Sequence, residues 1–199
     1  MMSTDPLDRL GTLFVVVGPS GAGKDSLISE ARKTLAGNSR IGFVRRVITR
    51  PSDGVTEDHI AVTETQFRTM VEAGAFAVHW QAHGLNYGIP ATTLDELAAG
   101  TSLIVNGSRE HLAEFARTYD KLIVLHVTAS PEIIALRLAA RGRESAEDIM
   151  RRMARQTQDW QIGLQVETID NSGDLHDAAH RFVNAIRTAQ SEQTAPVAV

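Results

Sequence analysis

A glycine-rich loop between a predicted strand and a predicted helix constrains the fold of this chain more than any other feature. Residues 13–17 (LFVVV) are an unbroken apolar run, which is typical of a buried strand. The loop of residues 18–26 follows, and apolar residues then recur at helical spacing from Lys24 to about Leu35. A strand, a tight loop and a helix in this order predict one unit of an α/β fold.

The rest of the chain repeats this alternation of strands and helices. Further strands are predicted at 43–48, 102–105, 122–127 and 166–169, and helices at 110–117 and 175–187. A helix is also expected to begin at Ser130, where serine precedes proline, and an arginine-rich helix is expected to end near Ile162. This order predicts a mainly parallel sheet flanked by helices.

The 199 residues are predicted to form one domain with smaller parts attached. The core is expected to comprise about residues 12–40 and 91–187. Residues 41–90 mix short strands, turns and one helix near 67–71, and we interpret them as an inserted lobe. Residues 188–199 are expected to be a disordered tail.

Composition argues against several classes of protein. Hydrophobic residues make up 43% and charged residues 22% of the chain, which indicates a folded globular protein. The apolar runs are too short for a membrane span and the first residues lack the features of a secretory signal, so neither is expected. The absence of cysteine excludes disulfides and thiolate sites and fits a cytoplasmic location. A net charge of -4 argues against a general nucleic-acid-binding surface.

The loop of residues 18–26 has the residue types that phosphate binding requires. It matches the pattern G-x-x-x-x-G-K. Glycines let successive backbone N–H groups face an anion, and the N-terminus of the following helix adds partial positive charge. Lys24 is predicted to act in catalysis as the charge that reaches the β- and γ-phosphates. The residues expected to bind the nucleotide are Gly18, Ser20, Gly21, Ala22, Gly23, Lys24, Asp25 and Ser26. The alternative is a glycine-rich turn that binds nothing.

One position of this loop departs from the usual pattern. Serine or threonine normally follows the lysine and places its hydroxyl on Mg²⁺, whereas this chain has Asp25 there and a hydroxyl at Ser26. A carboxylate also ligates Mg²⁺, directly or through water, so Asp25 is the predicted metal ligand. The alternative is an acidic residue that only complements the helix dipole.

Several segments resemble the guanylate-kinase-like group of P-loop kinases. They are GPSGAGKDSL at 18–27, VITRP at 47–51, HGLNYGIP at 83–90, VNGSR at 105–109 and RLAARGRE at 137–144. More closely, the chain resembles the ribose 1,5-bisphosphate phosphokinase family, which makes phosphoribosyl diphosphate in bacterial phosphonate breakdown. The matching segments keep their order over about residues 12–187. The resemblance implies a P-loop kinase fold, with ATP and Mg²⁺ as cofactors.

The departures from guanylate kinases concern the residues that would hold a guanine base. The resemblance places the two base-reading acids near Val78 and at Asn106, where this chain has no carboxylate. A phosphate-binding serine is replaced by Arg46 and a phosphate-binding tyrosine by His59, whereas Arg50 and Tyr87 are retained. These exchanges remove hydrogen-bond acceptors for a base and add donors, which suits an acceptor with a second phosphate and no base.

The resemblance thus implies an acceptor site in the lobe of residues 41–90 and at Arg109. The predicted substrate-binding residues are Arg46, Arg50, His59, His83, Tyr87 and Arg109, with Arg45 and His79 as further candidates. Alternatives stay open for several of them. One of the adjacent Arg45 and Arg46 is expected to point to solvent, and His83 before Gly84 could cap a turn.

Arginine outnumbers lysine 17 to 3, and six of these arginines cluster between residues 137 and 155. The resemblance implies that residues 137–155 form a lid over the nucleotide, with Arg141 and Arg143 as catalytic residues. One or two of Arg151, Arg152 and Arg155 are expected to belong to it as well. The alternative is a solvated basic helix balanced by nearby acidic residues.

The predicted activity is the ATP-dependent phosphorylation of ribose 1,5-bisphosphate to 5-phosphoribosyl 1-diphosphate (PRPP). An acceptor phosphate is ionised at neutral pH, so catalysis needs positioning and electrostatics but no general base. The missing acids count against a guanylate or other nucleoside monophosphate kinase. The intact loop counts against a non-catalytic guanylate-kinase-like interaction module. The predicted partner is a small-molecule substrate, and the sequence does not determine the oligomeric state.

Overall fold

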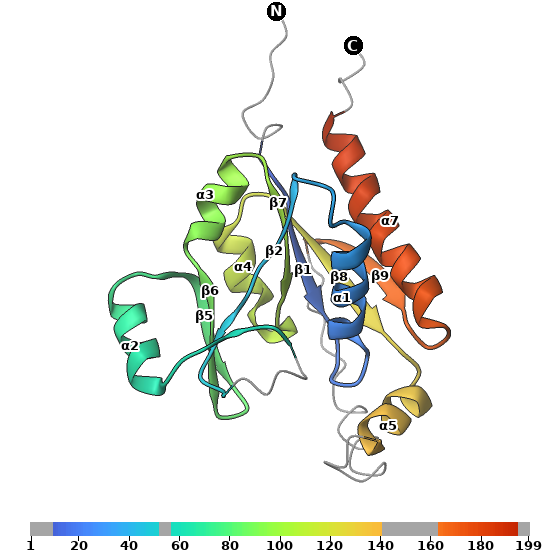
Figure 1. Cartoon of the computed structure of the whole chain (residues 1–199), viewed down its shortest axis with the longest axis horizontal. Helices are drawn as coiled ribbons and strands as arrows, with labels where there is room; N and C mark the ends of the chain where they lie inside the picture. The colour runs from blue at the N-terminus through green and yellow to red at the C-terminus, as the bar shows by residue number, and fades with distance from the viewer. Residues whose placement is uncertain (1–9, 52–56, 141–162, 195–199) are drawn as a thin grey trace, which may run out of the picture.

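The computed structural model describes residues 10–51, 57–140 and 163–194. Within them the chain forms a five-stranded sheet and a four-stranded sheet (Figure 1). All strand pairs of the five-stranded sheet are parallel, and its spatial order is β2 (Ile41–Phe43), β7 (Ser102–Asn106), β1 (Leu13–Val17), β8 (Leu122–Thr128) and β9 (Gln165–Asp170). The predicted α/β fold with a mainly parallel sheet is therefore confirmed.

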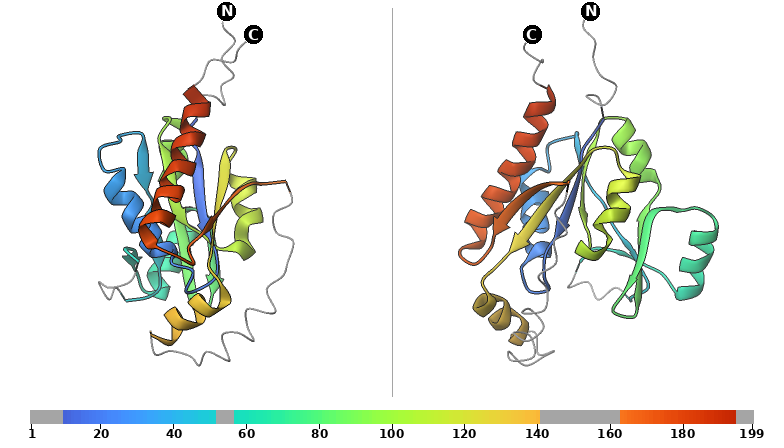
Figure 2. Two further views of the ribbon diagram at one scale, coloured as in Figure 1. Left: turned by 90° about the vertical axis from the view of Figure 1, so that its right-hand side faces the viewer. Right: turned by 180° about the vertical axis from the view of Figure 1, so that it is seen from behind.

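Helices cover both faces of the five-stranded sheet. Figure 2, left, shows α1 (Lys24–Thr34) and α7 (Leu175–Thr194) on one side of the strands and α4 (Leu112–Thr118) on the other. Helix α3 (Thr92–Ala98) packs on the same face as α4, because Leu97 and Phe115 belong to one buried cluster. The two helical layers bury every residue of β1 and β7, as is usual for the central strands of a parallel sheet, whereas most residues of the edge strand β9 are exposed.

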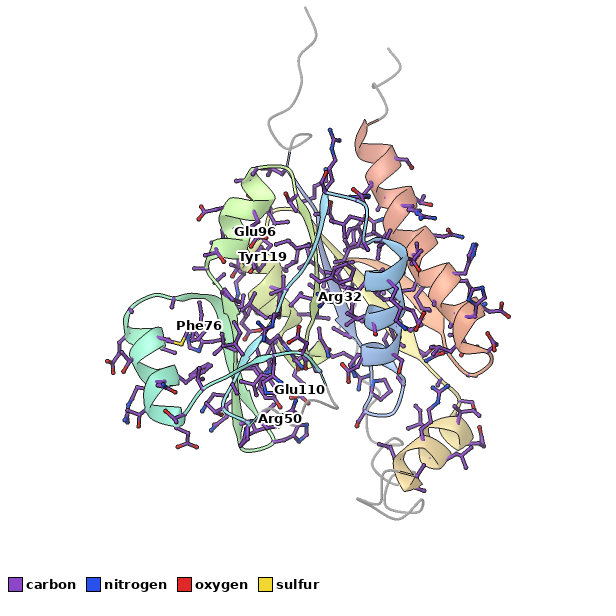
Figure 3. The ribbon with its side chains drawn as sticks, viewed as in Figure 1. Arg32, Arg50, Phe76, Glu96, Glu110 and Tyr119 are labelled. Carbon is purple, nitrogen blue, oxygen red and sulfur yellow. The ribbon has the colours of Figure 1, made fainter. Side chains whose placement is uncertain are left out.

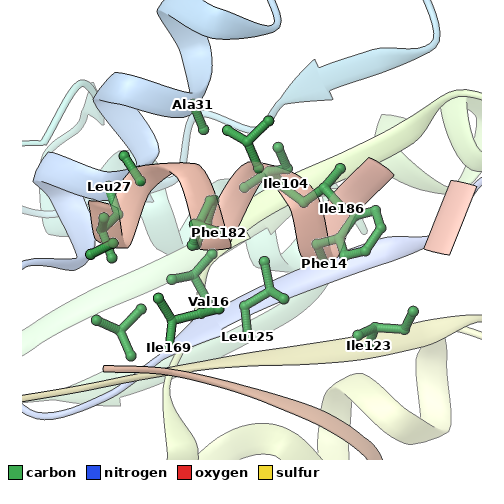
Figure 4. Packing of buried hydrophobic residues seen from close by; sticks show 14 of the residues in the cluster. Phe14, Val16, Leu27, Ala31, Ile104, Ile123, Leu125, Ile169, Phe182 and Ile186 are labelled. Atoms are coloured by element: carbon green, nitrogen blue, oxygen red, sulfur yellow. The ribbon is translucent and has the colours of Figure 1, made fainter. Parts of the chain in front are cut away.

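Strand β1 is the centre of the core, since all five of its residues are buried. Phe14 and Val16 face α1 and α7, where they meet Leu27 and Phe182 (Figure 4). Leu13, Val15 and Val17 face the opposite layer and pack with the α3 and α4 side chains. This alternation follows from the two-residue period of a strand, and it anchors the loop after β1 to the buried core.

The four-stranded sheet lies beside this core and has the order β4 (Ile60–Ala61), β3 (Val47–Ile48), β6 (Leu85–Pro90) and β5 (Phe76–Ala82). Its β3–β6 and β5–β6 pairs are antiparallel. Helix α2 (Glu64–Glu72) begins with a capping box at Thr63 and covers β5 through Phe67. Phe76, labelled in Figure 3, stacks on Phe67 with ring centroids 4.7 Å apart.

The two sheets share a buried cluster, so the smaller sheet is packed firmly onto the larger one. Trp80 of β5 and Ile89 of β6 pack with Val105 of β7 and Phe115 of α4 in this cluster. Trp80 also meets the Phe115 ring with centroids 5.9 Å apart. Strand β1 lies between β7 and β8, which precede and follow it in the spatial order, and open α/β sheets bind ligands beyond the carboxyl ends of their strands.

Several predicted elements differ from those observed. The single strand expected at 43–48 is two strands in different sheets, because β2 ends at Phe43 and β3 starts at Val47. The helix expected at 110–117 is found as α4, but it begins at Leu112, because the residues before it form a short 3₁₀ helix, Arg109–His111. The last helix does not stop at Arg187, where a disordered tail was expected to follow, but continues as α7 to Thr194.

Helix α5 (Pro131–Ala139) begins as predicted, with the Ser130 hydroxyl accepting a hydrogen bond from the Ile133 amide. The arginine-rich helix that was expected to end near Ile162 lies outside the described residues, as do Arg141 and Arg143. No helix in the described ranges has both the length and the apolar character needed to cross a membrane.

Candidate active site

The loop after β1 requires glycine at two of its positions. Gly18 has φ of 149°, and a side-chain carbon there would lie 2.1 Å from the Val127 carbonyl oxygen. Gly23 precedes α1 in the left-handed region with φ of 92°, and a side-chain carbon there would lie 2.3 Å from the Asn171 Nδ2. Both clashes involve groups that the fold holds in place, so the loop keeps its shape only with glycine.

Buried Asn171 and half-buried Arg137 hold this loop from behind. The Ala22 carbonyl oxygen accepts hydrogen bonds from the Asn171 Nδ2 at 2.7 Å and from the Arg137 Nη1 at 3.3 Å. Arg137 also donates to the Asn171 carbonyl at 2.9 Å, and Asn171 is fully buried. The sequence analysis assigned Arg137 to the lid and missed Asn171. The available signal for Asn171 was its position directly after β9, at the same edge of the sheet as the loop.

Lys24 lies where the loop meets the smaller sheet. Its Nζ donates to the carbonyls of Gly18 at 2.8 Å and Pro19 at 3.1 Å. Burial lowers the pKa of Lys24 to about 8, and the charges of Asp25, Arg46, Arg109 and Glu57 also act on it. The two arginines lower this pKa further, whereas the two carboxylates oppose the shift. Two predicted loop residues, Lys24 and Asp25, therefore interact electrostatically with two predicted acceptor residues, Arg46 and Arg109. The three cations outnumber the two carboxylates, so a bound phosphate would balance the excess positive charge.

Asp25 reaches across the carboxyl edge of the sheet. Its Oδ1 accepts a hydrogen bond of 2.8 Å from the Nδ2 of Asn106, the buried last residue of β7. Among the described residues, no group of three or more acidic or histidine side chains could hold a metal ion by itself. Mg²⁺ is commonly bound by one or two carboxylates together with phosphate oxygens and waters. A single oriented carboxylate beside a phosphate-binding loop therefore fits Mg²⁺.

Arg46 is a buried cation of the smaller sheet, and its partners were not predicted. Its Nε donates to the Glu57 Oε1 at 2.6 Å, and its Nη2 pairs with the Glu57 Oε2. Its guanidinium carbon lies 5.1 Å from the Tyr87 ring centroid and 6.0 Å from that of Trp80. Tyr87 and Trp80 stack on each other with centroids 5.4 Å apart. The sequence analysis found Arg46 and Tyr87 but missed Glu57 and Trp80.

Arg109 and Arg50 are two further predicted acceptor residues. Arg109 starts the 3₁₀ helix after β7, and burial lowers its pKa while Glu110 opposes the shift. Figure 3 labels Arg50 and Glu110 on the same lower side of the view as the loop after β1. His126 of β8, which was not predicted, has its pKa lowered by burial and then by Arg109. A histidine inside an otherwise apolar strand was the signal for it.

Other predicted acceptor residues have structural partners. His59 is buried, and its Nδ1 and Nε2 lie 2.8 Å and 3.0 Å from the backbone oxygens of Glu57 and Arg50. Backbone oxygens thus lie against both ring nitrogens, which favours a structural role over ligand contact. His83 is exposed and has a φ of 51° in the turn between β5 and β6, which favours the turn alternative. Arg45 is half exposed and pairs with Asp58, so it is the solvent-facing member of the Arg45–Arg46 pair.

Comparison with known proteins identifies the family. A family model described as an AAA domain matches residues 15–161. The ribose 1,5-bisphosphate phosphokinase PhnN of Agrobacterium fabrum is 45% identical to the chain over 175 residues, which cover 88% of the chain and 96% of that protein. The protein of the same name from Thiobacillus denitrificans is 44% identical over 93% of the chain and 97% of its own length. The chain belongs to the ribose 1,5-bisphosphate phosphokinase family.

The family also includes longer proteins. A bifunctional ribose 1,5-bisphosphokinase-thymidine phosphorylase from Cupriavidus pinatubonensis is 46% identical over 94% of the chain, but the chain spans only 31% of that protein. Among solved structures, a guanylate kinase from Anaplasma phagocytophilum superposes with a TM-score of 0.65 at 21% identity, covering 92% of this chain and 87% of that one. This likeness shows the fold alone. The predicted P-loop kinase fold and the predicted family are both confirmed.

Proposed function

We propose that the chain transfers the γ-phosphoryl group of ATP to the 1-phosphate of ribose 1,5-bisphosphate. An oxygen of that phosphate forms the new bond to the γ-phosphorus, and the bond to the bridging oxygen of ADP breaks. The products are ADP and PRPP. The observation that carries this proposal is that the Lys24 amine is held on the phosphate-binding loop while the charges of Arg46 and Arg109 act on it, since several cations at one site suit a donor and an acceptor that are both phosphates.

Different residues of the site bind the phosphate donor and the acceptor. The amides of the loop and the N-terminus of α1 face the donor phosphates, and Lys24 neutralises charge that develops during transfer. Arg46 and Arg109 bind the acceptor and hold it in line with the γ-phosphoryl group. No side chain needs to remove a proton, because the attacking phosphate oxygen is already ionised. Positioning and charge neutralisation are then sufficient for catalysis.

Other parts of the proposal rest on the sequence. The acceptor lobe is the segment predicted at 41–90 without β2, which belongs to the five-stranded sheet. The lid is the segment predicted at 137–155 without Arg137, which holds the phosphate-binding loop, and its Arg141 and Arg143 contact the transferring phosphoryl group. Residues 141–155 lie outside the described residues, so the roles of Arg141 and Arg143 stay predictions. The chain acts in the cytoplasm on a small-molecule substrate.

The acceptor assay is the direct test of this function. With ATP and Mg²⁺, we expect kcat/KM for ribose 1,5-bisphosphate to exceed the values for GMP, AMP and dTMP, because no carboxylate stands at the positions that would read a base. PRPP formation is measured directly, and ADP formation is measured by a coupled assay. A preference for GMP would contradict the proposal and favour a nucleotide acceptor. An absence of transfer to every acceptor would favour an interaction module.

Asp25 is the residue that we propose to hold Mg²⁺, either directly or through water. When bound, Mg²⁺ supplies positive charge to the phosphate oxygens. Asp25→Asn removes the carboxylate charge but keeps an oxygen that can accept the hydrogen bond from Asn106. We therefore expect the variant to need several-fold more Mg²⁺ for half-maximal rate, while its melting temperature stays close to that of the unchanged protein.

A matched control for this experiment is Glu30→Gln, which removes an acidic residue farther along α1 that pairs with Lys33. It should not alter the Mg²⁺ titration. If Asp25→Asn needs the same Mg²⁺ concentration for half-maximal rate as the unchanged protein and only its melting temperature is slightly lower, Asp25 complements the helix dipole and does not hold the metal.

A further inference from the structure

The Glu57 carboxylate engages only one edge of the Arg46 guanidinium. It takes the Nε–H and one N–H of Nη2, and these are two of the five N–H groups that an arginine side chain carries. This pairing leaves the other edge, between Nη1 and Nη2, for a second oxyanion. Arginine binds phosphate through two parallel hydrogen bonds of this kind. One guanidinium can thus hold a carboxylate and a phosphate at the same time.

The aromatic side chains and Glu57 restrain Arg46 in different directions. The Tyr87 and Trp80 rings, which are nearly parallel at 8°, lie against the guanidinium, and His111 stacks on Trp80 with centroids 5.7 Å apart. The aromatic rings contact the guanidinium and hold it by the attraction between a cation and a ring face. The Glu57 carboxylate, which is 14% exposed against 10% for Arg46, holds it along one edge through hydrogen bonds.

The ion pair also lies close to the site of phosphoryl transfer. Both Arg46 and Glu57 act electrostatically on the Lys24 amine, which is held by the carbonyls of the phosphate-binding loop. Glu57 and Arg46 are eleven residues apart in sequence, and the return of the chain into β4 beside β3 brings them together. The outer edge of Arg46 is therefore a fixed feature of the site.

We propose that Glu57 is a positioning residue of the acceptor site, which fixes Arg46 so that its outer edge receives an acceptor phosphate. This inference rests on the proposed function, because it requires a phosphorylated acceptor. The opposite arrangement, in which the phosphate displaces Glu57 from Arg46, would leave a carboxylate without its partner in a largely buried place. Binding at the outer edge keeps the ion pair intact.

The test compares Glu57→Gln and Glu57→Asp with the control Asp58→Asn. Glutamine has one oxygen and one N–H₂ group in place of the two carboxylate oxygens. Since a guanidinium has no acceptor for that N–H₂ group, the paired hydrogen bonds to Nε and Nη2 of Arg46 are lost. Aspartate keeps the carboxylate but carries it on a shorter side chain. We expect Glu57→Gln to raise the KM for ribose 1,5-bisphosphate about 10-fold, which corresponds to one lost hydrogen-bonding interaction. The KM for ATP should stay within about 2-fold, and kcat should fall less than the acceptor KM rises.

Glu57→Asp should recover part of the acceptor affinity. Asp58 is exposed and pairs with Arg45, so Asp58→Asn changes a neighbouring acid without touching the Arg46 pair and should leave all constants unchanged.

Three results would overturn this inference. A lower acceptor KM in Glu57→Gln would mean that Glu57 competes with the phosphate. Equal changes in kcat and in both KM values, with a lower melting temperature, would mean that Glu57 only supports the fold. If Glu57→Gln does not fold, an unchanged acceptor KM in Glu57→Asp, where the fork geometry is altered, would also reject positioning.

Failure of the proposed function gives a different result. The unchanged protein would then transfer phosphate to another acceptor and leave ribose 1,5-bisphosphate unused. The same comparison of KM values with that acceptor would still decide the role of Glu57. If Glu57→Gln raises the KM of a phosphate-bearing acceptor and leaves the KM of ATP unchanged, Glu57 positions Arg46. An unchanged acceptor KM rejects this role.

Discussion

Replacing Lys24 with alanine is expected to lower kcat by about 10²-fold or more while the protein keeps its fold. The Lys24 amine is held by the Gly18 and Pro19 carbonyls, so it is in place before the nucleotide binds. A preorganised charge at a developing negative charge costs no rearrangement during reaction, and losing one such group typically costs 10²- to 10³-fold. The kcat for PRPP formation and the thermal melting curve of the purified variant provide the measurement.

The lowered pKa of Lys24 makes the stability of the unchanged protein depend on pH. The folded protein releases the Lys24 proton near pH 8, whereas an unfolded chain holds it to about 10.5, so the charge disfavours folding below pH 8. This cost is relieved as the pH rises from about 8 to 10.5. The variant lacks the cost but also lacks the two hydrogen bonds, so its melting temperature at pH 7 should differ by only a few degrees.

Lys33→Ala is the matched control, since Lys33 lies on the same helix, is 69% exposed and pairs with Glu30. We expect it to keep full activity. A Lys24→Ala variant with the activity of this control would contradict the assignment of the loop, and it would favour a module that binds a partner without catalysis.

The features that sequence analysis predicted are those set by neighbouring residues. The apolar run at 13–17, the glycines after it and the Ser130 cap each determine their structure within a few positions, and all were found where expected. The break between β2 and β3 was missed because strand-forming residues stand on both sides of Arg45 and Arg46, although the two ends of the run at 43–48 pair with different sheets. Local propensity carries no information about which sheet a short strand joins.

The contacts that shape the site are formed between residues far apart in sequence. Arg137 and Asn171 meet at the Ala22 carbonyl across separations of 115 and 149 residues, and no periodic pattern links them. His59 looked like a candidate ligand because histidine is chemically versatile, but only the fold reveals that backbone oxygens surround both of its nitrogens. Glu57 was missed for the same reason, since a single acid in a loop gives no sign of its partner.

Replacing Arg46 with serine is expected to lower kcat/KM for ribose 1,5-bisphosphate by about 10²-fold without creating activity toward GMP. The loss follows from removing two charge-assisted hydrogen bonds to the acceptor phosphate, since loss of one partner of a buried charge pair typically costs about 2–5 kcal/mol. The matched control is Arg45→Ser, because Arg45 is the adjacent residue, is 51% exposed and pairs with Asp58 at the surface. Its kcat/KM should stay unchanged.

The GMP half of this prediction depends on which hydrogen-bond acceptors the site still offers. Asn106 is engaged with Asp25, and Val78 is buried in the shared core, so neither position can read a guanine edge. Arg46→Ser does release the Glu57 carboxylate, the acceptor nearest to the lost guanidinium. The double variant Arg46→Ser/Glu57→Gln therefore separates two effects, because it removes both the cation and the carboxylate left without a partner.

GMP activity in the single variant that disappears in the double variant would show that Glu57 can read a base and that Arg46 normally blocks it. GMP activity in both variants would mean that other residues select guanine, and it would contradict the acceptor assignment. We expect neither variant to use GMP. The Glu57 carboxylate alone cannot replace two base-reading acids, and this chain has Val78 and Asn106 at the positions of those acids. A guanine base that finds no hydrogen-bond acceptors for its N–H groups gains no binding energy from the site.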